Sequence, residues 1–266
     1  MPKIQVRDTV RIHYQEQGPD QGKGEALVLL HGLGSSGRDW EYQIPEFAKH
    51  YRVIAADFRG SGASDKPKGP YSIADYAEDT WALLDKLNVT KAHLVGLSMG
   101  GATAFEMAVR RPERVLNLIV VNCPPSFALS SPKKWFELAM RLTVVSLLGM
   151  DKMAEIVGKK LFPDAGQEDL KAQFQERYAA NKKQHYLWAL RSLAGWTALD
   201  RLKRIDAPAL MLTAEHDYTP VAEKQVAVDK LPRGKLQVIK HSRHATPIDQ
   251  PAAFNAAVLD FLKGGI

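Results

Sequence analysis

The chain has 266 residues, of which 45% are hydrophobic and 25% are charged; this excludes a disordered or fibrous protein and fits one α/β domain with an insertion. Its formal net charge is +6, but Lys and Arg are dispersed along the chain, which argues against a nucleic-acid partner. The single cysteine, Cys123, excludes an intrachain disulfide, and no apolar run reaches the roughly 18 residues that a membrane span needs.

The first part of the chain is predicted to form short strands followed by buried ones. Residues 4–6 and 11–15 have the pattern of two short strands. Residues 26–30 form a continuous apolar run, which is typical of a strand buried on both faces, and residues 52–56 form another. A helix is expected between these two runs, over residues 40–49. The pattern predicts a sheet that is covered on both sides.

A further helix is predicted after Ser72. A serine hydroxyl can accept a hydrogen bond from an N–H of the first helical turn, and the acidic Asp75 follows three residues later. Apolar residues then recur at helical spacing: Ile73, Tyr76, Ala77, Trp81, Leu84 and Leu87. This periodicity predicts an amphipathic helix with one face on the sheet.

The sequence Gly-Leu-Ser-Met-Gly-Gly over residues 96–101 separates a predicted strand (92–95) from a predicted helix (102–111). A Gly-x-Ser-x-Gly in that position is the nucleophile-elbow pattern. Gly96 and Gly100 have no Cβ to collide in so tight a turn. The helix that follows directs its N–H groups and its positive dipole end at the site. The pattern predicts that Ser98 is a nucleophile.

The strand–helix alternation predicts parallel βαβ units with helices on both faces of the sheet. After a strand over residues 115–121 the alternation stops, and helical patterns follow over residues 135–148, 167–180 and 184–193. It resumes with a strand (209–213), a helix (221–230), a strand (235–239) and a final helix (247–262). We therefore expect a core domain of residues 1–125 and 203–266 and a helical cap of residues 126–202.

Two residues after the resumed strands complete a serine hydrolase pattern. A serine needs a base to remove its proton, and the base needs a partner that fixes its tautomer. Asp217 follows the strand that ends at residue 213, and His244 follows the last strand, in the chain order serine, acid, histidine. Glu215 is a competing acid and His241 a competing base, and neither is excluded at this level.

An oxyanion hole is expected from two backbone amides. The residue after the nucleophile, Met99, offers one N–H, and Leu33, in the loop after the strand over residues 26–30, offers the other. Gly32 and Gly34 beside Leu33 allow the backbone to turn that N–H inward.

These motifs together resemble the α/β-hydrolase superfamily. The matching segments, in order, are residues 31–34, the loop 57–64, the elbow, Asp217 and His244. The resemblance implies an α/β fold with a mostly parallel, doubly wound, eight-stranded sheet and a helical cap insertion. Within the superfamily the chain is similar to the branch of esterases, enol-lactonases and C–C-bond hydrolases. One departure is Arg243, where the family usually has glycine before the catalytic histidine.

The predicted function is a serine hydrolase that cleaves a small, largely apolar carboxylic ester or lactone. A C–C-bond (diketone) hydrolase and a small-ligand receptor with slow turnover are the alternatives. We expect a small-molecule substrate, no cofactor, no metal, no nucleic acid and no membrane insertion. The first 14 residues lack a signal-peptide core, so a cytoplasmic protein is expected. Substrate-binding residues and oligomeric state are left open.

Other polar residues are expected to have structural roles. His31 belongs to a turn, His93 to a buried strand, and Asp57 and Arg59 brace their own loop. The helix over residues 135–148 is apolar on more than one face, which predicts that it is covered on several sides. The expected pocket is mostly apolar, and the basic pairs at residues 133–134 and 159–160 are expected outside it.

Overall fold

The computed structural model describes residues 2–7, 9–19 and 24–264. Eight strands form one sheet in the order β1-β2-β4-β3-β5-β6-β7-β8. They are β1 (Lys3–Arg7), β2 (Val10–Gln17), β3 (Ala26–Leu30), β4 (Arg52–Ala56), β5 (Ala92–Leu97), β6 (Val115–Val121), β7 (Ala209–Ala214) and β8 (Gly234–Ile239). β1 and β2 pair antiparallel, β2 is antiparallel to β4, and all other pairs are parallel. The mostly parallel eight-stranded sheet is therefore confirmed.

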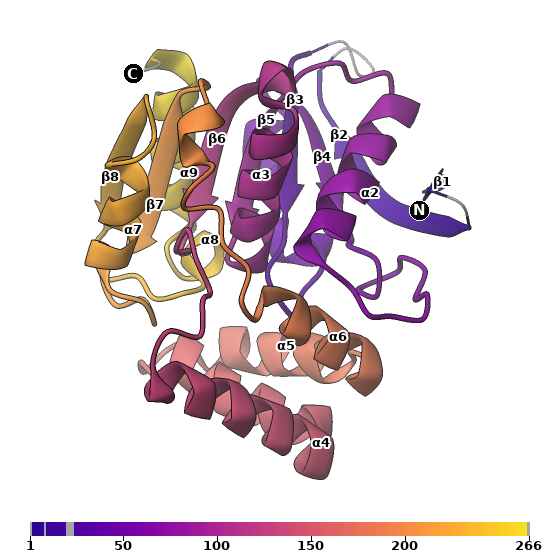
Figure 1. Ribbon diagram of the computed structural model, residues 1–266, viewed down its shortest axis with the longest axis vertical. Coiled ribbons are helices and arrows are strands. Elements are labelled where there is room, and N and C mark those ends of the chain that lie inside the picture. The colour runs from indigo at the N-terminus through magenta and orange to yellow at the C-terminus, as the bar shows by residue number, and fades with distance from the viewer. Residues whose placement is uncertain (1, 8, 20–23, 265–266) are drawn as a thin grey trace.

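Helices cover both faces of this sheet, as Figure 1 shows. One layer contains α2 (Ile73–Lys86), α3 (Met99–Arg110) and α7 (Val221–Val228), and the other contains α1 (Ile44–Phe47) and α9 (Pro251–Gly264). Along β3, Val28 and Leu30 pack in the first layer, whereas Leu27 and Leu29 pack in the second. Because side chains of a strand alternate between faces, a strand covered on both sides is apolar at every position.

The start of α2 follows the predicted capping pattern. The Ser72 hydroxyl accepts a hydrogen bond from the Asp75 N–H at 3.1 Å, and the Asp75 carboxylate accepts one from the Ser72 N–H at 3.1 Å. This reciprocal capping box satisfies two backbone donors that the first helical turn would leave unpaired.

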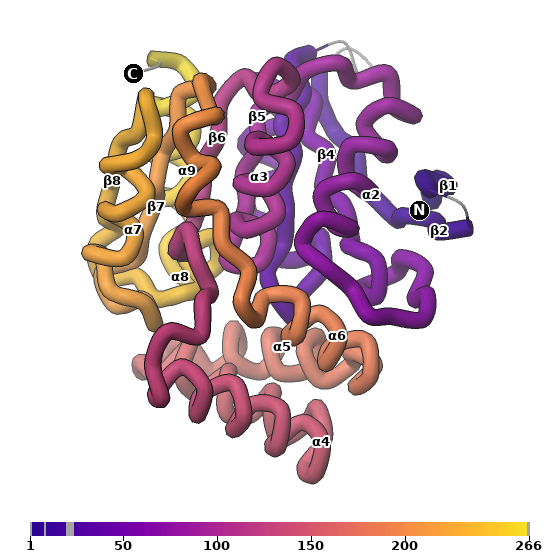
Figure 2. The backbone as a smooth tube through the Cα atoms, viewed as in Figure 1, coloured from indigo at the N-terminus to yellow at the C-terminus, as the bar shows by residue number. Residues whose placement is uncertain are grey.

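The chain between β6 and β7 forms a helical insertion, which comprises α4 (Pro132–Leu161), α5 (Glu168–Ala179) and α6 (Lys183–Leu193). Its helices share their own apolar cluster. Where the chain leaves and re-enters the sheet, Ser126 and Thr197 form an antiparallel bridge. Figures 1 and 2 show the insertion at the edge of the sheet where the parallel strands end. The described part of the chain contains no helix long and apolar enough to cross a membrane.

Three helices differ from the sequence-based expectation, each at a helix-breaking residue. The helix expected over residues 40–49 is a 3-10 turn (Gly37–Trp40) followed by α1, because Pro45 is accommodated only in the first turn of a helix. The final helix is likewise divided into α8 (Thr246–Asp249) and α9, which begins at Pro251. Gly149, at a φ of 82°, kinks α4, so that the helix continues past residue 148 in a new direction.

The expectation that residues 135–148 are covered on several sides is wrong. Four large apolar side chains of this segment are exposed: Trp135, Phe136, Leu147 and Leu148. Only one side of the helix packs within the insertion, through residues such as Val145.

We expect Ser72→Ala to lower the free energy of unfolding by about 1 kcal/mol, because it removes the side-chain acceptor at the N-terminus of α2. Urea unfolding monitored by circular dichroism measures this change. Ser72→Thr keeps the acceptor and is expected to lose less than half as much. Equal losses in the two variants would mean that the capping hydrogen bond does not stabilise α2.

Candidate active site

Ser98 occupies a strained turn between β5 and α3. Its φ of 54° and ψ of −113° are rare for a residue with a side chain. A Cβ on Gly96 would collide with the carbonyl oxygen of Gly100, and a Cβ on Gly100 would collide with that of Leu30. Both flanking positions therefore require glycine, and the turn presents Ser98 at the edge of the sheet where β3 also ends.

The loop after β3 lies beside Ser98 and is fixed by His31. The buried His31 accepts a hydrogen bond from the Phe58 N–H at Nε2 (3.0 Å) and donates one from Nδ1 to the Gly32 carbonyl (2.8 Å). Burial lowers the pKa of His31, which favours this neutral tautomer. A Cβ on Gly32 would lie 3.7 Å from the Ser98 Cβ. The predicted structural role of His31 is thus confirmed, and it positions the loop that carries Leu33.

The two amides expected in the oxyanion hole lie on the two sides of this turn. Met99 is the first residue of α3, where a backbone N–H has no acceptor within the helix. Leu33 lines the same cavity as Ser98. Gly34, with a φ of 74°, makes the bend that follows, and the side chain of Asn181 in the insertion donates a hydrogen bond to its carbonyl at 2.7 Å.

Asp217 and His244 form a direct pair, with 2.5 Å between Asp217 Oδ1 and His244 Nδ1. The second oxygen of Asp217 accepts hydrogen bonds from Lys224 Nζ at 2.5 Å and from the Thr219 hydroxyl at 2.9 Å. The Asp217 and Lys224 side chains are 1% and 0% exposed. Burial alone would raise the pKa of Asp217, but His244 and Lys224 outweigh it and hold the pKa well below its usual range. The carboxylate of Asp217 is therefore ionised at neutral pH.

The competing acid and base lie elsewhere. Glu215 pairs with Lys240 at 3.0 Å and accepts a hydrogen bond from the His241 N–H at 2.9 Å, in an exposed turn. These contacts direct Glu215 away from His244. The geometry therefore favours Asp217 and His244 over the alternatives.

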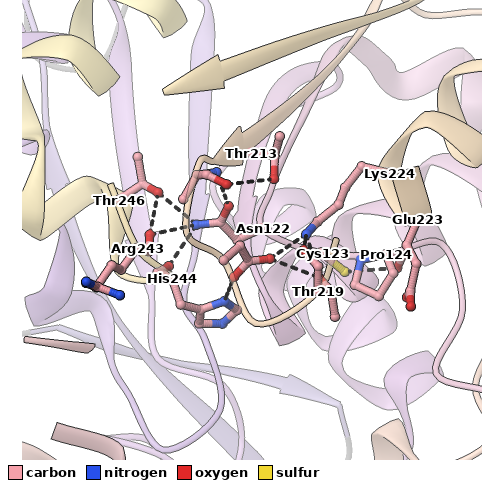
Figure 3. Close-up of polar contacts among 12 residues, drawn as sticks. Asn122, Cys123, Pro124, Thr213, Thr219, Glu223, Lys224, Arg243, His244 and Thr246 are labelled. Atoms are coloured by element: carbon pink, nitrogen blue, oxygen red, sulfur yellow. Dashed lines mark hydrogen bonds and ion pairs between the residues drawn. The ribbon is translucent and has the colours of Figure 1, made fainter. Parts of the chain in front are cut away.

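Asn122, which the sequence analysis did not single out, connects the acid strand to the histidine loop. It follows β6 with a φ of 48°. Its Nδ2 donates to the His244 carbonyl (2.9 Å) and to the Thr246 hydroxyl (2.7 Å), and its Oδ1 accepts from the Ala214 N–H (2.7 Å). Figure 3 shows Asn122, Lys224 and His244 within one polar cluster. In the sequence, the only signal for Asn122 was its place at the end of a predicted strand, because asparagine tolerates a left-handed backbone conformation at such a turn.

Asp249 holds the same loop from the other side. Its carboxylate accepts hydrogen bonds from the Arg243 N–H at 2.6 Å and from the Ser242 hydroxyl at 2.8 Å. The Arg243 side chain forms an ion pair with Asp164 of the insertion at 3.4 Å. The unusual arginine beside His244 therefore joins the histidine loop to the insertion.

Ser98, His244 and Leu33 line one cavity of about 430 Å³ between the sheet edge and the insertion. Most of its wall is apolar, as expected, and includes Leu97, Phe127, Leu138, Met140, Val157, Phe174 and Leu190. The expectation that the basic pairs lie outside is wrong for Lys134 and Lys160, which line the cavity. Within the described residues Ser98 Oγ makes no hydrogen bond, and no three His, Cys, Asp or Glu side chains are placed to hold a metal ion.

The remaining polar predictions agree with the structure. Asp57 accepts hydrogen bonds from the Gly37 and Ala63 N–H groups, and Arg59 pairs with Asp79 at 2.5 Å, so both brace loops. His93 is buried between Glu25 and Asn117.

Comparisons with known proteins show the family to which this fold belongs. Residues 25–251 match the family model described as alpha/beta hydrolase fold. The chain is 31% identical to 3-oxoadipate enol-lactonase 2 of Acinetobacter baylyi, with 99% of each covered. It is 30% identical to an assigned carbamate hydrolase, RutD, of Pantoea ananatis, over 95% of this chain and 93% of that protein. The crystal structure of an enol-lactonase from Burkholderia xenovorans matches with a TM-score of 0.90 at 26% identity, covering 98% of this chain and 100% of that one.

We expect Gly100→Ala to lower the free energy of unfolding by at least about 3 kcal/mol, because the new methyl group meets the backbone of β3. Gly149→Ala is the control: its φ is positive, unlike that of Gly100, but no atom lies within 4 Å of the added Cβ, so it should cost about 1 kcal/mol. Urea unfolding of both variants measures the difference. Similar losses would show that the backbone of β3 moves away from the added methyl group at little cost.

A pH-dependent prediction concerns Asp39, which lines the cavity and accepts a hydrogen bond from the Ser35 hydroxyl. Burial, opposed by Ser35 and Arg177, raises its pKa to about 6. Between pH 4 and 6 the folded state therefore binds more protons at Asp39 than the unfolded state does, and this group lowers stability as the pH rises. We expect Asp39→Asn to gain about 2 kcal/mol relative to the natural chain between pH 4 and 7.

Urea unfolding at five pH values tests this expectation. Asp206→Asn, at an exposed position, serves as the control and should change stability equally at every pH. If the difference between Asp39→Asn and the natural chain is the same at pH 4 and pH 7, the carboxyl of Asp39 titrates normally.

Proposed function

Because the chain belongs to the alpha/beta hydrolase family, we propose that it is a serine hydrolase that cleaves a small carboxylic ester or lactone through an acyl-enzyme on Ser98. The chain is a hydrolase, as its relatives are. In this proposal His244 is the base, Asp217 orients it, and the amides of Leu33 and Met99 form the oxyanion hole. Residues 126–202 act as a cap that selects the substrate.

The single observation that carries the proposal is the pair between Asp217 and His244 beside the Ser98 cavity. The Asp217 oxygen occupies His244 Nδ1 at 2.5 Å, so that Nε2 is the nitrogen left for a serine proton. Ser98 and His244 line the same cavity, and the hydroxyl of Ser98 makes no hydrogen bond within the described residues. Hydrogen bonds between nucleophile and base are often long in unliganded enzymes and shorten when substrate binds.

The reaction follows from these positions. Ser98 Oγ attacks the carbonyl carbon of the substrate while His244 Nε2 accepts its proton. The carbonyl oxygen gains negative charge, which the N–H groups of Leu33 and Met99 stabilise. Asp217 stabilises the imidazolium, which then protonates the departing alkoxide. Water, deprotonated by His244, attacks the acyl-enzyme and releases Ser98. In a lactone the departing oxygen remains part of the acyl chain, so the second step releases a single hydroxy acid.

The size and lining of the cavity support a small substrate. A volume of about 430 Å³ lies near the lower end of the range for ligand pockets, about 300–1,000 Å³. The relatives named as enol-lactonases support an ester-like oxygen as the leaving group, and the assigned carbamate hydrolase supports hydrolysis at a carbonyl carbon more broadly.

We expect Ser98→Ala and His244→Ala each to lower kcat for a p-nitrophenyl ester by about 10³-fold or more, because the triad acts as a unit. His241→Ala is the matched control, since its side chain lies in the exposed turn, and it should retain near-normal turnover. A fluorophosphonate should label Ser98, which peptide mapping identifies. Labelling at another residue, or an inactive His241→Ala with an active His244→Ala, would overturn the assignment.

Turnover measurements on the natural chain distinguish the ester or lactone hydrolase from the two alternatives, a C–C-bond hydrolase and a small-ligand receptor. Faster turnover of a vinylogous diketone than of esters or lactones would favour a C–C-bond hydrolase. A single turnover followed by a stable complex would favour a small-ligand receptor.

A further inference from the structure

Arg141 on α4 brings a positive charge into the largely apolar cavity that Ser98 and His244 line. The residue is half-buried, and Tyr178 and Tyr218 line the same cavity. A guanidinium remains protonated in proteins, so this charge is permanent.

The other charged side chains that line the cavity are paired or exposed. The pairs are Lys134 with Glu223 at 4.0 Å, Glu137 with Lys133 at 4.0 Å, and Asp39 with Arg177 at 3.9 Å. Lys160 is exposed to solvent. Over residues 2–7, 9–19 and 24–264, no carboxylate forms an ion pair with Arg141, and Glu137, one turn earlier on α4, acts on it only from a greater distance. Placing a charge below the surface without a counter-ion is costly, and a ligand that supplies the counter-ion removes that cost.

Arg141 offers N–H donors in a planar fork and no acceptor, which suits a planar carboxylate. The Tyr178 hydroxyl on the same cavity wall is already used, because it donates to the Tyr186 hydroxyl at 2.8 Å. Recognition of a carboxylate at this place therefore depends on Arg141.

Arg141 shares its cavity with the proposed base and nucleophile, since His244 and Ser98 line the same space of about 430 Å³. The Tyr218 ring, which also lines the cavity, stacks on the His244 imidazole, with 4.3 Å between ring centroids and 23° between planes. An anionic group held by Arg141 would thus belong to the same small molecule whose carbonyl meets Ser98.

We propose that Arg141 forms a carboxylate-binding subsite, and that the substrate is an ester or lactone that carries a second, free carboxylate. This inference rests on the proposed function, since it names the substrate class of the same site. It replaces the expectation from the sequence that the substrate is largely apolar.

Two esters that differ only in charge test the proposal: mono-p-nitrophenyl glutarate and its neutral analogue p-nitrophenyl 4-carbamoylbutanoate. The natural chain should hydrolyse the anionic ester with a kcat/KM about 10- to 100-fold higher. Arg141→Gln should remove this preference and change kcat/KM for the neutral ester less than threefold. Arg141→Lys keeps the charge but loses the fork of donors, so it should be intermediate. Lys133→Gln, an exposed position on the same helix, should leave both values unchanged.

A binding measurement keeps this proposal separate from the function of Ser98. Isothermal titration of the Ser98→Ala variant should detect glutarate but not glutaramide, and the added Arg141→Gln change should abolish the glutarate signal. If no ester is hydrolysed but Arg141-dependent glutarate binding persists, the carboxylate subsite stands and the serine hydrolase proposal fails. Equal losses for both esters in Arg141→Gln, no preference for the anionic ester, or glutarate binding unaffected by Arg141 would overturn the subsite.

Discussion

The contact between Gly100 and the end of β3 is the constraint on which the site depends. A side chain on Gly100 would strike the Leu30 carbonyl, so the first turn of α3 lies directly on the backbone of the neighbouring strand. This closeness brings the N-terminus of α3 next to the loop that starts at His31. The amide of Met99 and the loop that carries Leu33 are thereby placed on either side of Ser98. The positions of the two amides in the proposed oxyanion hole thus follow from backbone packing, and His31 fixes the loop through its two hydrogen bonds.

The pairing of buried charges fixes the positions of Asp217 and His244. Asp217 is almost fully buried, and it shares its two oxygens between His244 and Lys224. A buried carboxylate is tolerated when each oxygen is paired, and here one partner is structural and the other is the proposed base. Asn122 and Asp249 then hold the backbone around His244, so the imidazole has little freedom to leave its position.

The insertion and the core contribute different properties to the cavity. The core supplies the groups proposed to react, while α4, α5 and α6 supply most of the apolar wall and Arg141. The two parts are joined around the cavity by Asn181 on the Gly34 carbonyl and by Arg243 on Asp164. A change of substrate therefore requires changes in the insertion, and the turn at Ser98 can remain the same.

The sequence by itself determined the strands, the elbow and the order of serine, acid and histidine, because strand burial, helical periodicity and glycine turns are set by neighbouring residues. Helix ends at Pro45, Gly149 and Pro251 were missed where one residue divides a periodic segment. Only the tertiary structure paired Asp217 with His244 and not Glu215, and found Asn122, Lys224 and Arg141. Asn122 acts through partners distant in the chain, residues 243–246, and no local pattern encodes such contacts. Lys224 binds Asp217 only seven residues away, but the turn between them follows no regular period. The catalytic roles of Ser98, Asp217, His244, Leu33 and Met99 stay predictions, since geometry brings groups together and only chemistry tests what they do.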